Sequence, residues 1–122
     1  MTSSFLIAFN KTRGLEVARK IVKADTWDSR SRGLLGRKAL SQDEGMWIIP
    51  CAMIHMFFMK FAIDAVFLDR QNRVVRVFRN LKPWRATPWV WGANSVLELA
   101  DGAADQLSRG DVLEFMRENN ER

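Results

Sequence analysis

Five side chains that bind soft metal ions or carry out nucleophilic chemistry lie close together in the sequence: Cys51, Met53, His55, Met56 and Met59. Thiolate, thioether and imidazole groups are together the ligands that Cu(I) prefers. Cys51 and His55 are also the only cysteine and the only histidine of the chain, and a thiol beside an imidazole can act as a catalytic nucleophile. The segment therefore indicates two kinds of chemistry, a soft-metal (copper or zinc) site at Cys51, Met53 and His55, or a Cys–His enzyme.

Strand geometry argues against a site made by this segment alone. In an extended chain Cys51 and His55 share one face with Met53 and Met59, but at about 3.3 Å per residue their Cα atoms lie ~13 Å apart. Two ligands of one metal, or a nucleophile and its base, would therefore need a bend after Cys51 to meet. A zinc site made of several histidines is excluded, because the chain has only one. Met and free Cys also commonly fill hydrophobic cores, so packing is the alternative interpretation, and we expect no cofactor.

Charged side chains within strongly apolar stretches form a second set of candidates. Lys60 and Asp64 flank or interrupt apolar residues in 57–68, and Glu98 interrupts an apolar strand. An ionisable group buried among strands needs either a partner or a role. Lys60 and Asp64 could pair with each other or with backbone groups and simply fix the entry to a strand. The position of Glu98 along its strand predicts an outward-facing, solvated side chain.

Basic residues recur at every third position after residue 69. A strand places alternate residues on opposite faces, so this period does not build one basic surface. Aromatic side chains near basic ones are nevertheless typical of sites for single-stranded nucleic acids, and Trp84, Trp89 and Trp91 stand near the end of the series. Binding to an anionic polymer is therefore a second alternative, although nucleic acid is not the partner we expect. The series comprises Arg70, Arg73, Arg76, Arg79, Lys82 and Arg85.

Composition is typical of one globular domain, which we assign to residues 1–122. The chain is 48% hydrophobic and 27% charged, and its net charge of +5 favours anionic partners without specifying a fold. A single cysteine forms no intrachain disulfide and gives no support for an oxidising compartment. The apolar start at 5–9 is too short for a signal peptide, and the longest apolar region, 47–59, is too short to span a bilayer. We expect a bacterial, cytoplasmic protein without a membrane segment, and leave its oligomeric state open.

Alternating apolar residues and turn residues predict a mainly β fold of short strands. Asp69 to Asn72 reads as the turn of a hairpin, and so does the polar cluster between the first two strands. Residues 53–58 are ambiguous between strand and helix. We expect a frayed end at 118–122. The predicted strands are 5–9, 15–22, 46–49, 65–68, 73–78, 95–99 and 112–115.

Two short helices are predicted beside these strands. Thr26 begins the first, Ser29 follows three residues later, and Gly36 is placed like a terminating glycine. Asp101 begins the second, which extends to Leu107. Eight Phe and five Trp with no Tyr indicate a core with heavy aromatic packing. The predicted core is Phe5, Ile7, Leu34, Trp47, Ile49, Phe58, Ile63, Phe67, Val75, Val77, Leu97, Leu99 and Val112.

An ordered series of motifs resembles the prokaryotic family catalogued as domain of unknown function 192. It begins with Ser-Arg-Gly-Leu-Leu-Gly-Arg at 31–37 and is strongest from Pro50-Cys51 to Asp69. The family commonly has Trp where Phe58 stands and often Pro where Ala62 stands, so the chain is similar to its Phe-containing branch. The series covers about 18–115 and continues at 45–46, 74–75, 83–84, 96–99, 102 and 110–111.

The resemblance implies a jelly-roll-like β-sandwich or barrel with one or two short helices and implies no reaction. No Gly-rich phosphate loop, metalloprotease helix motif or nucleophile elbow occurs in the sequence. We therefore expect a small non-catalytic binding or accessory module for a small ligand or a protein partner. If the motif marks a shared surface, its polar members should gather at one edge of the fold. These candidate ligand-binding residues are Arg37, His55, Lys60, Asp64 and Glu98.

Overall fold

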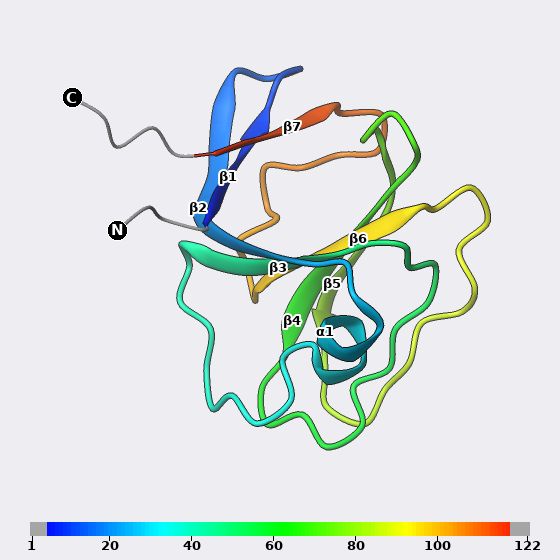
Figure 1. Cartoon of the computed structure of the whole chain (residues 1–122). Helices are drawn as coiled ribbons and strands as arrows, with labels where there is room; N and C mark the ends of the chain where they lie inside the picture. The colour runs from blue at the N-terminus through cyan, green and yellow to red at the C-terminus, as the bar shows by residue number, and fades with distance from the viewer. Residues whose placement is uncertain (1–4, 118–122) are drawn as a thin grey trace.

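The computed structural model describes residues 5–117. Within this range seven strands form one strongly curled sheet, in the order β5-β4-β6-β3-β2-β1-β7 (Figure 1). All neighbouring strands are antiparallel except β2 and β3, and the helix α1, the one helix among residues 5–117, lies in the crossover that joins them. The elements are β1 (Leu6–Asn10), β2 (Leu15–Ala24), α1 (Trp27–Arg32), β3 (Glu44–Ile48), β4 (Ile63–Leu68), β5 (Val74–Leu81), β6 (Ser95–Ala100) and β7 (Leu113–Arg117).

The two edges of the sheet meet just before β5 and β7. Arg73 and Val112 form an isolated antiparallel bridge there. The backbone N–H of Leu113 donates to the carbonyl of Asn72 at 2.9 Å, and that of Val74 donates to the carbonyl of Asp111 at 2.7 Å. These bonds cover edge groups that would otherwise be open to pairing with another chain. The mainly β prediction is confirmed, and of its two alternatives the single curled sheet corresponds to the barrel.

Both predicted hairpins are present. β1 pairs with β2, and β4 pairs with β5 around the turn that begins at Asp69. The Asp69 carboxylate accepts hydrogen bonds from the backbone N–H groups of Gln71 and Arg73, each at 2.9 Å. Asn72 has a φ of 61°, a left-handed conformation that asparagine tolerates better than most residues. The short polar residues of the turn therefore fix the register of the hairpin.

The helix begins where predicted and ends earlier. Thr26 caps it, because its hydroxyl accepts from the N–H of Ser29 and the Ser29 hydroxyl accepts from the N–H of Thr26, each at 3.1 Å. The helix ends at Arg32 rather than near Gly36, since Gly33 already adopts a φ of 48°. The second predicted helix, 101–107, is wrong. The chain forms turns there, and Gly102 has a φ of 92° that no right-handed helix allows.

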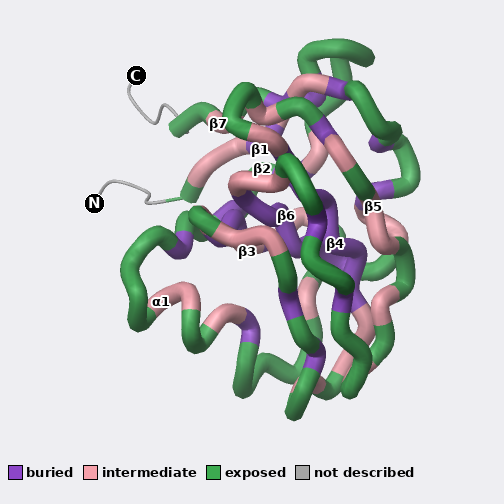
Figure 2. Tube along the Cα trace, turned by 90° about the vertical axis from the view of Figure 1, so that its right-hand side faces the viewer, coloured by how far each residue is buried: buried purple, intermediate pink, exposed green. Residues whose placement is uncertain are grey.

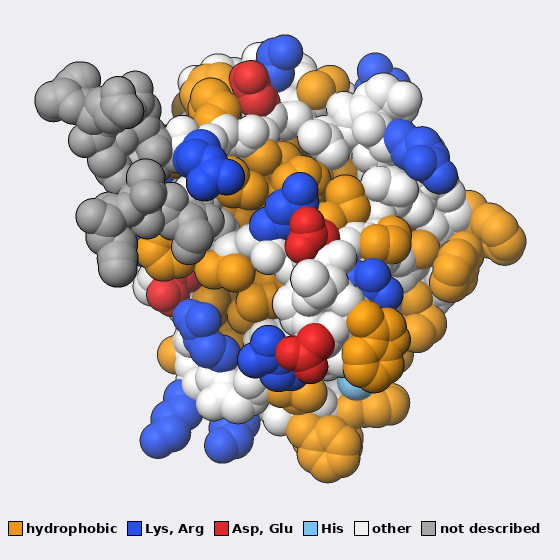
Figure 3. All heavy atoms as spheres, in the orientation of Figure 1, with side chains coloured by type: hydrophobic (Ala, Val, Ile, Leu, Met, Phe, Trp, Pro, Cys, Tyr) orange, Lys and Arg blue, Asp and Glu red, His pale blue; other side chains and the backbone are white. Residues whose placement is uncertain are grey.

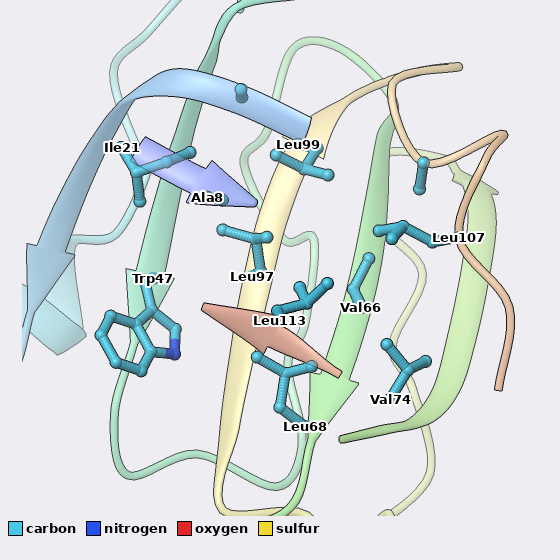
Figure 4. Close-up of a cluster of buried hydrophobic side chains, with 12 residues drawn as sticks. Ala8, Ile21, Trp47, Val66, Leu68, Val74, Leu97, Leu99, Leu107 and Leu113 are labelled. Carbon is cyan, nitrogen blue, oxygen red and sulfur yellow. The ribbon is translucent and has the colours of Figure 1, made fainter. Parts of the chain in front are cut away.

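The inside of the curled sheet holds the main core, to which every strand contributes (Figure 4). Val66 and Leu68 of β4 lie next to Leu97 and Leu99 of the neighbouring strand β6 in this core, and all four are fully buried. Gly45 of β3 lies against β6 so closely that an added Cβ would stand 2.7 Å from the carbonyl oxygen of Glu98. We name this side the inner face of the sheet.

The opposite side of β3, β4 and β6 is buried as well, and we name it the outer face. Ile63, Ala65 and Phe67 of β4 lie on it, covered by the chain around α1 and by the two loops 49–62 and 82–94. β4 and β6 are therefore buried along their whole length, as the purple segments of Figure 2 show. Burial on both faces explains why these two strands read as apolar runs.

Part of the predicted core lies at the surface. Phe5 is 37% exposed and Phe58 is 70% exposed, so both assignments are wrong. Phe5 precedes the first strand, and Phe58 lies in loop 49–62 rather than in a strand. Most other members are buried or half-buried. Both residues were assigned from the alternation of strands that the structure does not form at those positions.

Candidate functional site

A cavity of about 290 Å³ lies on the outer face, between the end of α1 and loop 49–62. β6 reaches it through Glu98, and β3 reaches it through Ile48 and the residues that follow. Its wall combines apolar, sulfur-containing and charged side chains, which is typical of pockets for small molecules. The residues that line it are Arg30 to Leu35, Ile48, Pro50, Cys51, Met53 to Met56, Met59 and Glu98.

Glu98 is the buried acid of this cavity. Its side chain points to the outer face, opposite to its neighbours Leu97 and Leu99, and only 6% of the residue is exposed. No group of residues 5–117 donates a hydrogen bond to the carboxylate, whose oxygens are open to the cavity. Burial raises the pKa of Glu98 to about 7. The prediction of a solvated Glu98 was wrong, because loop 49–62 and α1 cover the face to which its strand position directs it.

Cys51 lies beside this acid and is half-buried. Burial raises the pKa of its thiol, with a further increase from the negative charge of Glu98 and an opposing effect of the Arg30 guanidinium. The thiol donates a hydrogen bond to the carbonyl of Met53 at 3.2 Å. A thiol with a raised pKa is mostly protonated at neutral pH and is a poor nucleophile. The raised pKa therefore favours Cys51 as a polar lining residue of the cavity over Cys51 as a catalytic nucleophile.

His55 lines the same cavity but is exposed to solvent. Its backbone pairs with Ala86 of loop 82–94, and its ring stacks on Phe57 with centroids 4.6 Å apart. The backbone N–H of Phe57 donates to Nδ1 at 3.3 Å, so the neutral ring carries its proton on Nε2. That N–H is the group His55 could offer to a ligand.

The sulfur-containing residues of loop 49–62 also face the cavity. Met53 is exposed, Met56 is fully buried and Met59 is half-buried, and all three are lining residues. The loop is bent rather than extended, which removes the distance argument against a local site. However, within residues 5–117 no group of three or more His, Cys, Asp or Glu side chains is arranged to hold a metal ion.

Asp64 lies on the inner face, away from the cavity. It is fully buried, and its Oδ1 accepts from the N–H of Asn80 at 2.9 Å. Its Oδ2 accepts from the N–H groups of Gly102 and Ala104, both at 3.0 Å. The carboxylate thus binds β5 and the turn after β6 to β4, and it pairs with backbone groups rather than with Lys60.

The two remaining candidates are exposed. Arg37 follows α1, and its guanidinium donates to Glu44 at 3.2 Å. Lys60 lies in loop 49–62 and forms no ion pair with any other residue in the described range. The structure therefore brings His55 and Glu98 to one cavity and places Arg37, Lys60 and Asp64 outside its lining.

Comparisons with known proteins agree with this architecture. Residues 8–115 match DUF192, described as Uncharacterized ACR, COG1430. The chain belongs to the DUF192 family. A UPF0127 protein of Thermococcus sibiricus (strain DSM 12597 / MM 739) is 34% identical over 113 residues, which cover 87% of this chain and 72% of the relative. A second UPF0127 protein, PF1050 of Pyrococcus furiosus, is 33% identical, covering 88% of this chain and 97% of the relative.

Two crystal structures share the fold of this DUF192 domain. A protein of unknown function from Novosphingobium aromaticivorans DSM 12444 superposes with a TM-score of 0.76 at 23% identity, covering 89% of this chain and 82% of the other. A protein described as a putative transcription regulator from Sinorhizobium meliloti 1021 gives a TM-score of 0.71 at 21% identity, covering 90% and 91%. At these identities the likeness shows the fold alone. No helix among residues 5–117 is long and apolar enough to cross a membrane.

Sequence reasoning about the DUF192 motif missed most of the cavity wall. Arg30 and Leu34 come from α1 and the turn after it, and Ile48 and Ile54 frame the start of loop 49–62. The signal that could have found them is that SRGLLGR and the Pro50-Cys51 segment are both strong parts of the motif. Both motif segments contribute lining residues to the one cavity.

Proposed function

We propose that this DUF192 domain is a non-catalytic binding module that holds a small ligand in the cavity beside Glu98. The observation that carries the proposal is that Glu98, 94% buried as a residue, directs its carboxylate into a cavity and has no hydrogen-bond donor among residues 5–117. Burying an acid in this way disfavours its charged form and destabilises the fold unless something compensates. A ligand that supplies a donor is the simplest compensation.

The wall specifies the chemistry of that ligand. Leu34, Ile54 and Met56 offer an apolar and polarisable surface for its body. Glu98 requires an N–H, O–H or ammonium group at one end, because an ionised carboxylate is an acceptor only. Arg30, whose charge reaches Cys51, lies on the α1 side and suits an acidic or carbonyl group at the other end. A small amphipathic molecule with a donor at one end fits these three requirements.

The proposal assigns different roles to the five candidate ligand-binding residues predicted from the sequence. Glu98 and His55 are ligand-binding residues in it, Asp64 is part of the scaffold, and Arg37 and Lys60 lie outside the cavity. A cytoplasmic location and a bacterial source remain parts of the proposal, supported for the location by the free thiol of Cys51. The soft-metal and anionic-polymer alternatives are tested by the same experiment.

A thermal-shift screen tests the proposal, because a ligand that binds only the folded state raises its melting temperature. The wild-type domain is screened against small amines, amino alcohols and zwitterions, with Cu(I), Zn²⁺ and a polyanion in separate wells. Each hit is repeated on Glu98→Gln, which keeps the shape and removes the charge. Glu44→Gln serves as the matched control, since Glu44 lies outside the cavity.

We expect at least one small donor molecule to raise the melting temperature of the wild type and of Glu44→Gln, and to lose most of its effect on Glu98→Gln. Shifts that survive unchanged in Glu98→Gln would place the ligand elsewhere and contradict the proposal. Stabilisation by Cu(I) or Zn²⁺ alone, lost in Cys51→Ser, would replace it by the soft-metal alternative. Stabilisation by the polyanion alone would replace it by the anionic-polymer alternative.

A further inference from the structure

Five aromatic side chains stand out from loops 49–62 and 82–94, next to the cavity but not part of its lining. Phe58, Trp84 and Trp91 are 70%, 58% and 85% exposed, and Phe57 and Trp89 are exposed as well. Aromatic side chains normally bury most of their surface, so this concentration at the surface needs an explanation. Figure 3 shows hydrophobic side chains gathered along the right and lower right of the molecule. We name these five residues the aromatic rim.

The two loops that carry the rim are held together by backbone hydrogen bonds. Loops 49–62 and 82–94 run side by side and are joined by backbone hydrogen bonds, from Val90 to Ala52 at 2.8 Å and from Thr87 to Ile54 at 2.9 Å. The N–H of Trp84 continues the series to the carbonyl of Met56 at 2.8 Å. The rings also contact one another, with centroids 4.8 Å apart for Phe58 and Trp84. The aromatic residues therefore project from a fixed frame.

Two of the rim residues occupy backbone positions that normally belong to glycine. Phe58 has a φ of 67° and Trp84 has a φ of 69°, values that bulky side chains rarely adopt. Each is the third residue of a four-residue turn, closed by a bond from Met59 N–H to the carbonyl of Met56 and by one from Arg85 N–H to the carbonyl of Lys82. Glycine would fit both turns with less strain. Strained residues of this kind concentrate at functional sites, so the exposed rings have a use that outweighs the strain.

The loops that carry the rim are basic. They contain Lys60, Lys82 and Arg85, all exposed, and no Asp or Glu. The rest of the chain mixes both signs of charge, which makes a purely cationic pair of loops distinctive. Trp and Phe beside Lys and Arg are the residues that seat proteins at the interface of an anionic bilayer, where the rings lie at headgroup level and the cations meet lipid phosphates.

We propose that the aromatic rim docks this domain on the surface of an anionic lipid bilayer. Phe58, Trp84 and Trp91 enter the headgroup region, and Lys82 and Arg85 bind the lipid phosphates. The cavity then opens close to the membrane surface, since His55 both lines the cavity and stacks on Phe57 of the rim. The inference stands without the proposed ligand, because no rim residue is a lining residue of the cavity.

Other occupants fit the rim less well. Carbohydrate sites need carboxylate or amide side chains for the sugar hydroxyls, and the two loops contain one such side chain, Asn94. Their other uncharged hydrogen-bonding groups include His55 and the buried Thr87. Single-stranded nucleic acid needs free ring faces on which its bases stack. Trp84 already contacts two rings of the rim, Phe57 at an interplanar angle of 28° and Phe58 at 61°, and Trp89 meets Trp91 at 64°. These contacts leave less free ring face for a base. A protein partner is the remaining occupant and becomes an outcome of the test.

Vesicle flotation tests the inference. The wild-type domain is mixed with vesicles of phosphatidylcholine alone or with added phosphatidylserine, and binding is followed by flotation and by tryptophan fluorescence. The decisive variants are Phe58→Gly and Trp84→Gly, which remove a rim side chain and relieve its strained turn. We expect each to weaken binding to phosphatidylserine vesicles about tenfold, with a melting temperature equal to or above that of the wild type.

Charge and position are tested with further variants. Lys82→Gln and Arg85→Gln should each weaken binding on the order of fivefold and lower its dependence on salt. Leu15→Ala, which removes an exposed apolar side chain from the hairpin of β1 and β2, and Glu98→Gln, which alters only the cavity, should bind vesicles like the wild type.

The inference is overturned if the wild type fails to float with phosphatidylserine vesicles at low ionic strength, or if the two glycine variants bind as well as the wild type. It is also overturned if the rim instead drives self-association or binding to single-stranded DNA, measured by sedimentation in the absence of lipid.

Discussion

Two buried carboxylates on neighbouring strands of this domain have opposite surroundings. Asp64 of β4 points to the inner face and Glu98 of β6 to the outer face, although the two strands pair directly through Ala65 and Glu98. Asp64 accepts three backbone hydrogen bonds. Glu98 accepts none from residues 5–117 and faces a cavity. The same chemical group at nearly the same residue burial is a structural element in one place and an acid that faces a cavity without a hydrogen-bond donor among residues 5–117 in the other.

The difference teaches that burial alone does not reveal the role of a charged residue. Asp64 is needed because the turn after β6 has N–H groups that no strand satisfies, and a carboxylate satisfies two of them at once. The fold offers Glu98 no such partner, and a hydrophobic side chain would fill its position with less cost. Glu98 is therefore the residue on which the proposed ligand site rests.

The largest expected effect comes from Asp64→Ala. Removing the carboxylate leaves three N–H groups without an acceptor, at about 1–3 kcal/mol each, so we expect the free energy of unfolding to fall by about 4 kcal/mol. Chemical denaturation measures it. Asp64→Asn is the control, because its carbonyl oxygen keeps part of the bonding and should recover about half of the loss. A change below about 1 kcal/mol in Asp64→Ala would contradict the structural role.

Glu98→Gln should raise the free energy of unfolding at alkaline pH, whereas Asp64→Ala lowers it. Burial raises the folded-state pKa of Glu98 to about 7, above the ordinary glutamate value of 4.5. Between these two values the folded protein holds a proton that the unfolded chain has released. The free energy of unfolding therefore falls as pH rises from about 4.5 to about 7, by on the order of 3 kcal/mol in total, and stays low above that range.

The glutamine variant lacks this titration. Its free energy of unfolding should equal or exceed that of the wild type above pH 7, and its advantage should shrink and disappear as pH falls toward 4.5. Denaturation of both proteins across this pH range measures the difference. A difference between the two proteins that stays constant with pH would show that the carboxylate has a partner in the folded state after all.

Sequence reasoning predicted most of the fold, because local patterns determine strands and turns. Asp69 to Asn72 carries its own turn chemistry, and Thr26 with Ser29 carries its own helix cap. The failures are places where tertiary contacts decide. Asp101 looks like a helix N-cap, but Asp64 takes the N–H groups of Gly102 and Ala104 that a helix would need to arrange differently.

The candidate site was predicted less well, since it depends on which face of a strand is covered. The alternation around Glu98 correctly separates it from Leu97 and Leu99, yet the sequence does not show that the other face is buried too. The content of Phe and Trp predicted a core with heavy aromatic packing, but here too the tertiary structure decides which of these side chains are covered. Trp47 lies in the core, whereas Trp27, Trp84, Trp89 and Trp91 are exposed. Amino-acid type predicts burial on average, and the exposed tryptophans are where that average fails in this domain.

A third carboxylate sharpens the comparison, because it has partners without burial. Glu44 at the start of β3 accepts from the N–H of Ser41 at 3.0 Å and from the Arg37 guanidinium at 3.2 Å. The hydrogen bond from Ser41 and the charge of Arg37 lower the pKa of Glu44. Both side chains of the pair are more than a third exposed, Arg37 at 41% and Glu44 at 35%. Water and salt therefore screen their attraction.

Arg37→Ala accordingly gives the smallest expected effect, a loss of about 0.5 kcal/mol in the free energy of unfolding. Added salt should reduce the wild type's advantage further, since the ion pair is exposed. Because Arg37 does not line the cavity, the variant should also retain any thermal shift that depends on Glu98. Denaturation at low and high salt, together with one ligand from the screen, measures both. If Arg37→Ala abolishes that ligand's thermal shift while leaving stability intact, the binding site extends beyond the cavity to the loop after α1, and Arg37 rejoins Glu98 and His55 as a binding residue.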